Sequence, residues 1–202
     1  MILILKNTSK VTRAKFLMIL SALSFSFMAA LVKSSPYSPE FNAFARQLIS
    51  LIFISLIIIN RNYKIIPSRE NWIKLILRSI FGTIGIYFYF YSIDNLLLAN
   101  ASILSRISPF FVIIFAFFIL KERINKVTWL IFIPMIIGNI FIIKPNSDLF
   151  NPNSLYALIS AFFGALAYTM IKSIGEKESY YTIIFWFTLI STLILLIFSI
   201  DE

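Results

Sequence analysis

The sequence predicts an all-α polytopic membrane protein with about seven transmembrane helices. Of its 202 residues, 59% are hydrophobic and 13% are charged, and the mean hydropathy is +0.89. A soluble domain carries roughly 25% charged residues, because its surface faces water. The apolar stretches are near 20 residues long, which is the length of helix that spans a hydrocarbon core of about 30 Å. They are continuous, whereas the strands of a membrane barrel would alternate apolar and polar residues.

Seven apolar stretches follow one another along the chain, and we expect each to form one spanning helix. Proline, serine, asparagine and basic residues separate them, as is typical of helix ends and turns. The first stretch has no small-residue cleavage site and other stretches follow it, so we expect a retained helix rather than a signal peptide. The seven predicted spans are 16–32, 41–60, 75–93, 97–120, 127–143, 155–172 and 181–200.

The distribution of Lys and Arg predicts the orientation, because cytoplasmic loops of membrane proteins collect basic residues. With the N-terminus inside, 14 of the 18 basic residues fall on the cytoplasmic side, Arg78 among them, and only Lys33 and Lys144 fall outside. The other two, Arg46 and Arg106, lie within predicted spans. We therefore expect a multi-pass protein of the cell inner membrane with a cytoplasmic N-terminus. The same bias explains the net charge of +9 without nucleic-acid binding.

The composition also argues against an enzyme. The chain has no cysteine and no histidine, so disulfides, Cys/His metal sites and thiol or imidazole catalysis are excluded. No phosphate-binding or dinucleotide-binding glycine motif is present. All nine acidic residues lie at or beyond the ends of the predicted spans, so no buried carboxylate pair is available for acid–base chemistry. We expect no cofactor, no metal and no catalytic residue.

The chain also contains a weak internal repeat. Shifting the sequence by 139 positions places the first predicted span on the sixth, with Ser21-Ala22 on Ser160-Ala161 and Lys33-Ser34 on Lys172-Ser173. A repeat unit of five helices has an odd number of spans, so its second copy would be inverted. Inverted repeats are typical of secondary transporters, whose substrate site lies at the repeat interface.

Particular residues resemble the ten-helix, EamA-like branch of the drug/metabolite transporter superfamily. The resemblance runs from about Phe16 to Ile200 and is most specific in a proline midway through the fourth span, followed by a Glu-Arg pair at its end. The matching positions are Arg46, Arg78, Gly82, Gly85, Pro109, Glu122, Arg123, Gly138, Lys144 and Pro145. Short stretches near residues 150–152 and 177–179 are similar to S-adenosylmethionine carriers of the same family.

This resemblance implies a secondary transporter of small metabolites or drugs. It divides the chain into a basic N-terminus at 1–15, a first five-helix repeat at 16–145, a periplasmic loop at 146–154 and an incomplete second repeat at 155–202. Two whole repeats would need ten helices, and only seven are predicted. The alternative is therefore a non-transporting fragment, or a half-carrier that needs a complementary membrane chain.

Arg106 is the first candidate substrate-binding residue. It lies near the middle of the fourth span, where an arginine costs roughly 2.5–3.5 kcal/mol on insertion scales. On a helix it shares one face with Asn95, Ala99, Ser102 and Pro109. Arg106 and Ser102 are expected to line a cavity, and the alternative is an arginine that only locks helix packing. The family usually has a neutral residue at Arg106, and this departure favours a substrate with a negative group.

Arg46 and Tyr89 complete the candidate site. Arg46 lies in the outer half of the second span and is expected to form a second cationic wall, unless it extends to the outer interface. No acidic residue lies inside a span to pair with either arginine. Tyr89 shares a helical face with Arg78, Gly82 and Gly85, and it would either contact substrate or pack.

Six residues are expected to have structural roles. The glycines favour close helix contacts, the prolines favour kinks, and the acid favours an ion pair at the end of the fourth span. These residues are Gly82, Gly85, Pro109, Glu122, Pro134 and Gly138.

Overall fold

A computed structural model describes residues 10–122, 130, 134, 137–138 and 152–200. The regular elements in these ranges are all helical, and six helical segments are long and apolar enough to cross a membrane. They match six of the seven predicted spans. The fifth predicted span, 127–143, lies mostly outside the described residues. The elements are α1 Lys10–Lys33, α2 Pro39–Arg61, α3 Trp72–Asn95, α4 Leu98–Ser105, α5 Ser108–Leu120, α7 Ser154–Ile174 and α8 Tyr180–Phe198, with single 3-10 turns at Arg69–Asn71 and Gly175–Lys177.

Local sequence signals set several helix ends. At the start of α2, the Ser38 side chain accepts a hydrogen bond from the Phe41 amide at 3.2 Å, and Pro39 occupies the first turn. Both features are typical of helix N-termini. At its other end, Asn62 adopts a left-handed backbone with φ of 52° and closes the last turn onto the Ile58 carbonyl.

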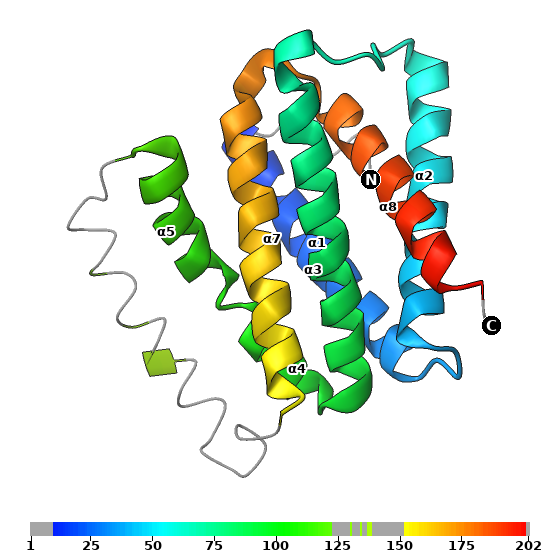
Figure 1. The fold of residues 1–202 in the computed structure, drawn as a ribbon, viewed down its shortest axis with the longest axis vertical. Coiled ribbons are helices and arrows are strands. Elements are labelled where there is room, and N and C mark those ends of the chain that lie inside the picture. The colour runs from blue at the N-terminus through cyan, green and yellow to red at the C-terminus, as the bar shows by residue number, and fades with distance from the viewer. Residues whose placement is uncertain (1–9, 123–129, 131–133, 135–136, 139–151, 201–202) are drawn as a thin grey trace.

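Helix α3 is the centre of the bundle (Figure 1). It packs along α7 on one side, while α8 packs against both α2 and α3. Gly85 permits a close approach to α7, because a Cβ atom there would lie 3.1 Å from the backbone nitrogen of Gly164. The Ser160 hydroxyl donates to the Gly85 carbonyl at 2.8 Å across the same contact. Gly85 therefore lies at a close contact between α3 and α7.

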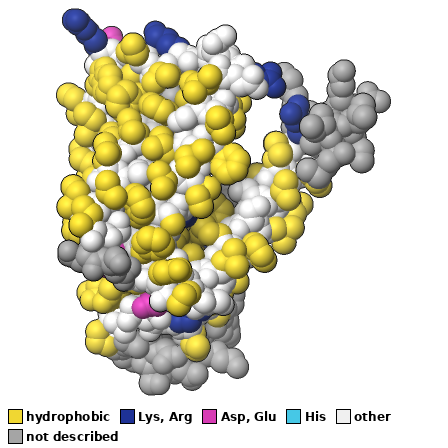
Figure 2. Space-filling view, turned by 90° about the vertical axis from the view of Figure 1, so that its right-hand side faces the viewer, with side chains coloured by type: hydrophobic (Ala, Val, Ile, Leu, Met, Phe, Trp, Pro, Cys, Tyr) yellow, Lys and Arg dark blue, Asp and Glu magenta, His cyan; other side chains and the backbone are white. Residues whose placement is uncertain are grey.

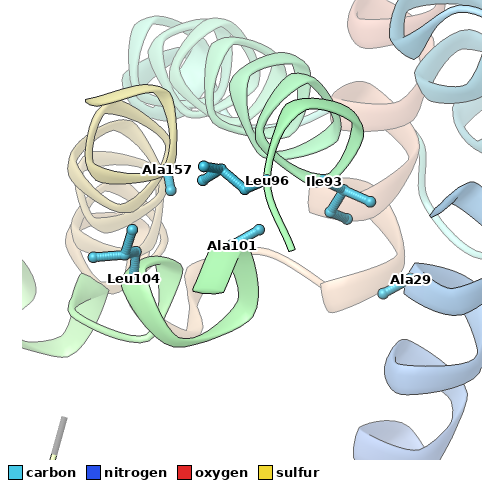
Figure 3. Close-up of a cluster of buried hydrophobic side chains, with 6 residues drawn as sticks. All are labelled: Ala29, Ile93, Leu96, Ala101, Leu104 and Ala157. Carbon is cyan, nitrogen blue, oxygen red and sulfur yellow. The ribbon is translucent and has the colours of Figure 1, made fainter. Parts of the chain in front are cut away.

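Helix α1 crosses behind α3 and α7, and most of its residues are exposed (Figure 1). Its C-terminal part contacts the bundle in an apolar cluster with residues of α3, α4 and α7 (Figure 3). Ala29, Ile93 and Ala101 are buried in this cluster. Lys33, the last residue of α1, donates from Nζ to the carbonyls of Ile93, Asp94 and Leu96 at 2.9–3.0 Å. The lysine therefore satisfies carbonyl groups at the C-terminal end of α3.

The fourth span is interrupted. Helix α4 ends at Ser105 and α5 begins at Ser108, with Pro109 in the first turn of α5. Proline has no N–H for the Ser105 carbonyl, and its ring collides with that carbonyl in a regular helix. Arg106 and Ile107 instead form short-range bonds to Ile103 and Leu104. The fourth span is therefore divided into two helices just before Pro109.

The two inter-helix segments at one end of the bundle are joined to each other. We call this contact the loop clamp and define it by Ser68, Asn71 and Glu178. The Glu178 carboxylate accepts three hydrogen bonds. The donors are the backbone amide of Ser68 at 2.8 Å, the Ser68 hydroxyl at 2.6 Å and the side-chain amide of Asn71 at 3.0 Å. Nearby, Thr182 donates to the Lys64 carbonyl and Trp186 donates to the Ile65 carbonyl. The α2–α3 connection is therefore held against the start of α8.

Candidate functional site

Arg46 lies on α2, seven residues after the helix begins. Its Nη1 donates to the side-chain oxygen of Gln47 at 3.2 Å, and its guanidinium lies over the ring of Phe25 on α1 at 5.7 Å. The hydroxyls of Tyr89 and Tyr168 lie within electrostatic range of its charge. The structure thus brings together Arg46 and Tyr89, two of the four residues that the sequence analysis proposed for substrate binding.

Arg78 is a second arginine within the bundle, and the sequence analysis assigned it to the cytoplasmic side. In the structure it lies six residues inside α3. Its guanidinium lies 3.9 Å from the ring centroid of Phe187 on α8 and above Gly82, which has no Cβ to displace it. Gly82 therefore makes room for an arginine. The sequence contained a signal for this contact, because Arg78 and Gly82 are one helical turn apart and share a helical face with Tyr89.

Two buried donors near these arginines have no acceptor. The Nε of Arg78 and the Nε2 of Gln47 are buried and have no hydrogen-bond partner among the described residues. Gln47 is only 1% exposed. A buried donor without a partner costs about 1–3 kcal/mol, so such groups call for an explanation. A bound solute with a carboxylate or phosphate oxygen would accept hydrogen bonds from these two donors.

A hollow opens beside α1, and a basic side chain is visible inside it (Figure 2). In the part of the chain that the structure describes, no carboxylate forms an ion pair or a hydrogen bond with Arg46 or Arg78. Glu40, at the start of α2, accepts from the Tyr87 hydroxyl at 3.0 Å instead. The region between the helices therefore carries cationic donors and phenols without a matching anion.

Arg106 lies apart from this group. It caps the C-terminus of α4, its side chain is exposed, and no contact in the described ranges joins it to Arg46. Ser102 is half-buried, and its carbonyl accepts from the Ser105 hydroxyl at 2.9 Å. Asn95, Ala99 and Pro109 are exposed as well. The predicted polar face of the fourth span thus lies on the open surface of the described bundle.

The remaining predicted residues are placed as follows. Glu122 forms an ion pair with Lys172 at the end of α7, whereas its predicted neighbour Arg123 lies outside the described residues. Pro134 and Gly138 are helical, and a Cβ at Gly138 would meet no atom of the described ranges within 4 Å. A surface pocket at the loop-clamp end of α2 and α8 contains none of the predicted site residues.

Comparison with known proteins identifies relatives. The sequence model of the EamA-like transporter family matches residues 12–144. The chain is 34% identical over 183 residues to the pseudopaline exporter CntI of Pseudomonas aeruginosa, covering 88% of this chain and 63% of the exporter. It is 28% identical over 190 residues to human solute carrier family 35 member G1, covering 87% and 52% of the two chains.

A further relative is the S-adenosylmethionine uptake transporter of Rickettsia prowazekii, 27% identical over 119 residues, which is 59% of this chain and 40% of the transporter. No solved structure matches the chain. The chain spans less than two thirds of the length of these relatives.

Proposed function

Because the chain belongs to the EamA-like transporter family, we propose that it carries a small anionic or zwitterionic metabolite across the cell inner membrane. The relatives are named as transporters and not as enzymes, and their named cargoes include pseudopaline and S-adenosylmethionine. The observation that carries the proposed substrate charge is the group of donors around Arg46 and Arg78. A substrate carboxylate or phosphate would supply the acceptors that this group lacks.

The proposed substrate-binding residues are Arg46, Tyr89, Ser102 and Arg106, together with Arg78. Arg46 would hold the anionic group, because a guanidinium offers two parallel donors to a carboxylate. Tyr89 would offer a hydroxyl beside it. Arg106 and Ser102 would contact substrate from the fourth span, on a surface that is open in the described bundle.

Uptake into membrane vesicles tests the proposal, with radiolabelled S-adenosylmethionine and a panel of amino-acid derivatives with and without a free carboxylate. Arg46→Ala and Arg106→Ala should each lower uptake of the carboxylate-bearing solute about tenfold or more, because one charge-assisted hydrogen-bonded contact is worth roughly 1.5–3 kcal/mol. Arg46→Lys should recover only part of the activity, since an ammonium is a point charge and not a planar fork.

The matched control is Arg69→Ala, which removes an exposed arginine from the 3-10 turn that precedes α3. Membrane abundance is measured for every variant. If abundance falls in step with uptake, the arginines serve packing and the substrate assignment is wrong. If the variants transport neutral and anionic solutes equally well, the proposed charge selectivity is wrong.

A second candidate function is a half-carrier that is completed by a complementary membrane chain. Two observations favour it. Only 6% of the α1 span and 11% of the span at Leu98–Leu120 are buried within the structure, so much apolar surface is exposed. The side chain of Arg106 is exposed as well. We propose accordingly that residues 16–145 form one five-helix repeat and that residues 155–202 begin an inverted second one.

A further inference from the structure

A pocket at the loop-clamp end of the bundle lies between the last turn of α2 and the first turn of α8. Its volume is about 440 Å³, and its lining residues are Ile57, Asn60, Arg61, Tyr63 and Tyr181. Its position is set by the span ends, because α2 ends at Arg61 and α8 begins at Tyr180. If these helices cross a membrane, the pocket lies at the level of the lipid head groups.

The polar side of this pocket suits an anion. Two other basic side chains at this end have protein partners: Lys177 pairs with Glu70, and Lys74 donates to the Ser173 carbonyl. The Arg61 guanidinium has no hydrogen bond or ion pair within the described ranges. Asn60 and Tyr181 line the same pocket, and Tyr181 lies in the first turn of α8, where the helix dipole has its positive end.

Two tyrosines give the pocket an aromatic wall. The rings of Tyr63 and Tyr181 stack with centroids 4.1 Å apart and an interplanar angle of 15°. A hydrogen bond to the Tyr181 side chain raises the pKa of Tyr63 above its ordinary value. Tyrosines are enriched at the membrane–water interface, where one end of the ring meets apolar groups and the other meets polar ones.

The side of the pocket toward the span interior is apolar and open. Ile57 lines the pocket and is 42% exposed, and Phe53, one turn further along α2, is 64% exposed. On α8, Ile184 is 43% exposed. A free phosphate would use only the polar wall, whereas a phospholipid would place its phosphate beside Arg61 and its acyl chain along these side chains.

We propose that this pocket binds the head group of an anionic phospholipid. Basic pockets between helix ends are typical sites for acidic lipids. The site is separate from Arg46 and Arg78, so the inference stands whether or not the chain transports a solute.

Lipid retention by the purified full chain in mild detergent tests this assignment, measured by native mass spectrometry. Three probes are added separately: phosphatidylglycerol, phosphatidylcholine and inorganic phosphate. Phosphatidylglycerol should be retained at one site and phosphatidylcholine much less. Arg61→Gln should weaken phosphatidylglycerol binding about fivefold, since one basic residue near a membrane surface contributes about that factor. Arg61→Lys should retain most of the binding.

The matched control is Arg69→Gln, which removes the same charge at the same end but outside the pocket. Equal losses for Arg61→Gln and Arg69→Gln would show general surface attraction and overturn the site. Equal retention of phosphatidylcholine would overturn the selectivity for acidic lipid. Binding of inorganic phosphate as tight as that of phosphatidylglycerol would assign the pocket to a free anion instead. If Arg61→Gln does not fold, the site is tested by lipid retention in Arg61→Lys and by the retention of phosphatidylglycerol relative to phosphatidylcholine on the wild-type chain.

Discussion

At the residue scale, two glycines of α3, Gly82 and Gly85, have different roles because different atoms occupy the space that a Cβ would fill. Above Gly82 are the far ends of two side chains, the Arg78 guanidinium and the Phe187 ring. Above Gly85 is the backbone of α7 at Gly164. A side-chain end can move at little cost, whereas a helix backbone within a packed bundle cannot.

We therefore expect opposite outcomes from two alanine substitutions on α3. Gly82→Ala should displace the Arg78 guanidinium, lower uptake in the vesicle assay several-fold and change the unfolding temperature little. Gly85→Ala should separate α3 from α7, weaken the Ser160 hydrogen bond and destabilise the protein by about 1–3 kcal/mol. Thermal unfolding in detergent, measured beside uptake, distinguishes the two effects. Equal destabilisation by both changes would show that Gly82 serves helix packing, as the sequence analysis expected.

At the scale of elements, the loop clamp joins two connections that are more than a hundred residues apart in the sequence. Burial raises the pKa of Glu178, but hydrogen bonds from Asn71, from the Ser68 hydroxyl and from the Ser68 amide, together with the charge of Lys64, outweigh burial and lower it. A lowered pKa in the folded state means that the ionised carboxylate stabilises the fold. This stabilisation is present above the ordinary glutamate value of 4.5 and is lost as the pH falls through the lowered value.

The clamp therefore predicts a pH-dependent stability that one substitution removes. Glu178→Gln should lower the unfolding temperature at pH 7 by roughly 2–4 °C, for the loss of ~1 kcal/mol of hydrogen bonding. As the pH falls from about 5 to below the lowered pKa of Glu178, the wild type should lose stability, and Glu178→Gln should lose less. Glu70→Gln is the matched control, because it removes an exposed carboxylate of the same segment. Similar pH profiles for wild type and Glu178→Gln would contradict the assigned role of the clamp.

At the scale of the whole molecule, the basic residues still predict an orientation after Arg78 is moved into the bundle. Thirteen basic residues remain on the proposed cytoplasmic side, which is the 14 of the sequence analysis less Arg78, against two outside. A reporter fused after Lys64 should therefore read as cytoplasmic, and one fused after Glu202 should read as periplasmic. Reversed signals would contradict both the orientation and the count of seven spans.

The exposed faces of α1 and α4 lead to a prediction about assembly. A bilayer satisfies the charge of Arg106 poorly, so a partner that covers this face should stabilise the chain. We expect low thermal stability for the chain alone and a higher unfolding temperature when a three-helix chain corresponding to the remainder of the relatives is co-expressed. Mass and unfolding temperature in mild detergent, with and without that chain, measure the effect. A stable monomer of about 23.3 kDa that transports solute without a partner would overturn the half-carrier proposal.

Four features follow from the amino-acid sequence without the structure: the class of protein, the places of the six described spans, the disruption of the fourth span at Pro109 and the family. These follow from local properties: hydropathy over a bilayer-length window, proline at a fixed position in a helix, and motif spacing. Helix ends differed by up to six residues, as at α1, which begins at Lys10 and not at residue 16.

Only the tertiary structure decided which polar residues lie together. The sequence analysis counted Arg78 among the basic residues of the cytoplasmic side, and the contact of its guanidinium with Phe187 between α3 and α8 emerged only from the structure. It joined Arg46 with Arg106 because both lie in the outer half, yet the structure places Arg46 beside Phe25 and leaves Arg106 exposed. Periodicity assigns residues to a face of one helix, but which neighbour covers that face depends on contacts between distant segments.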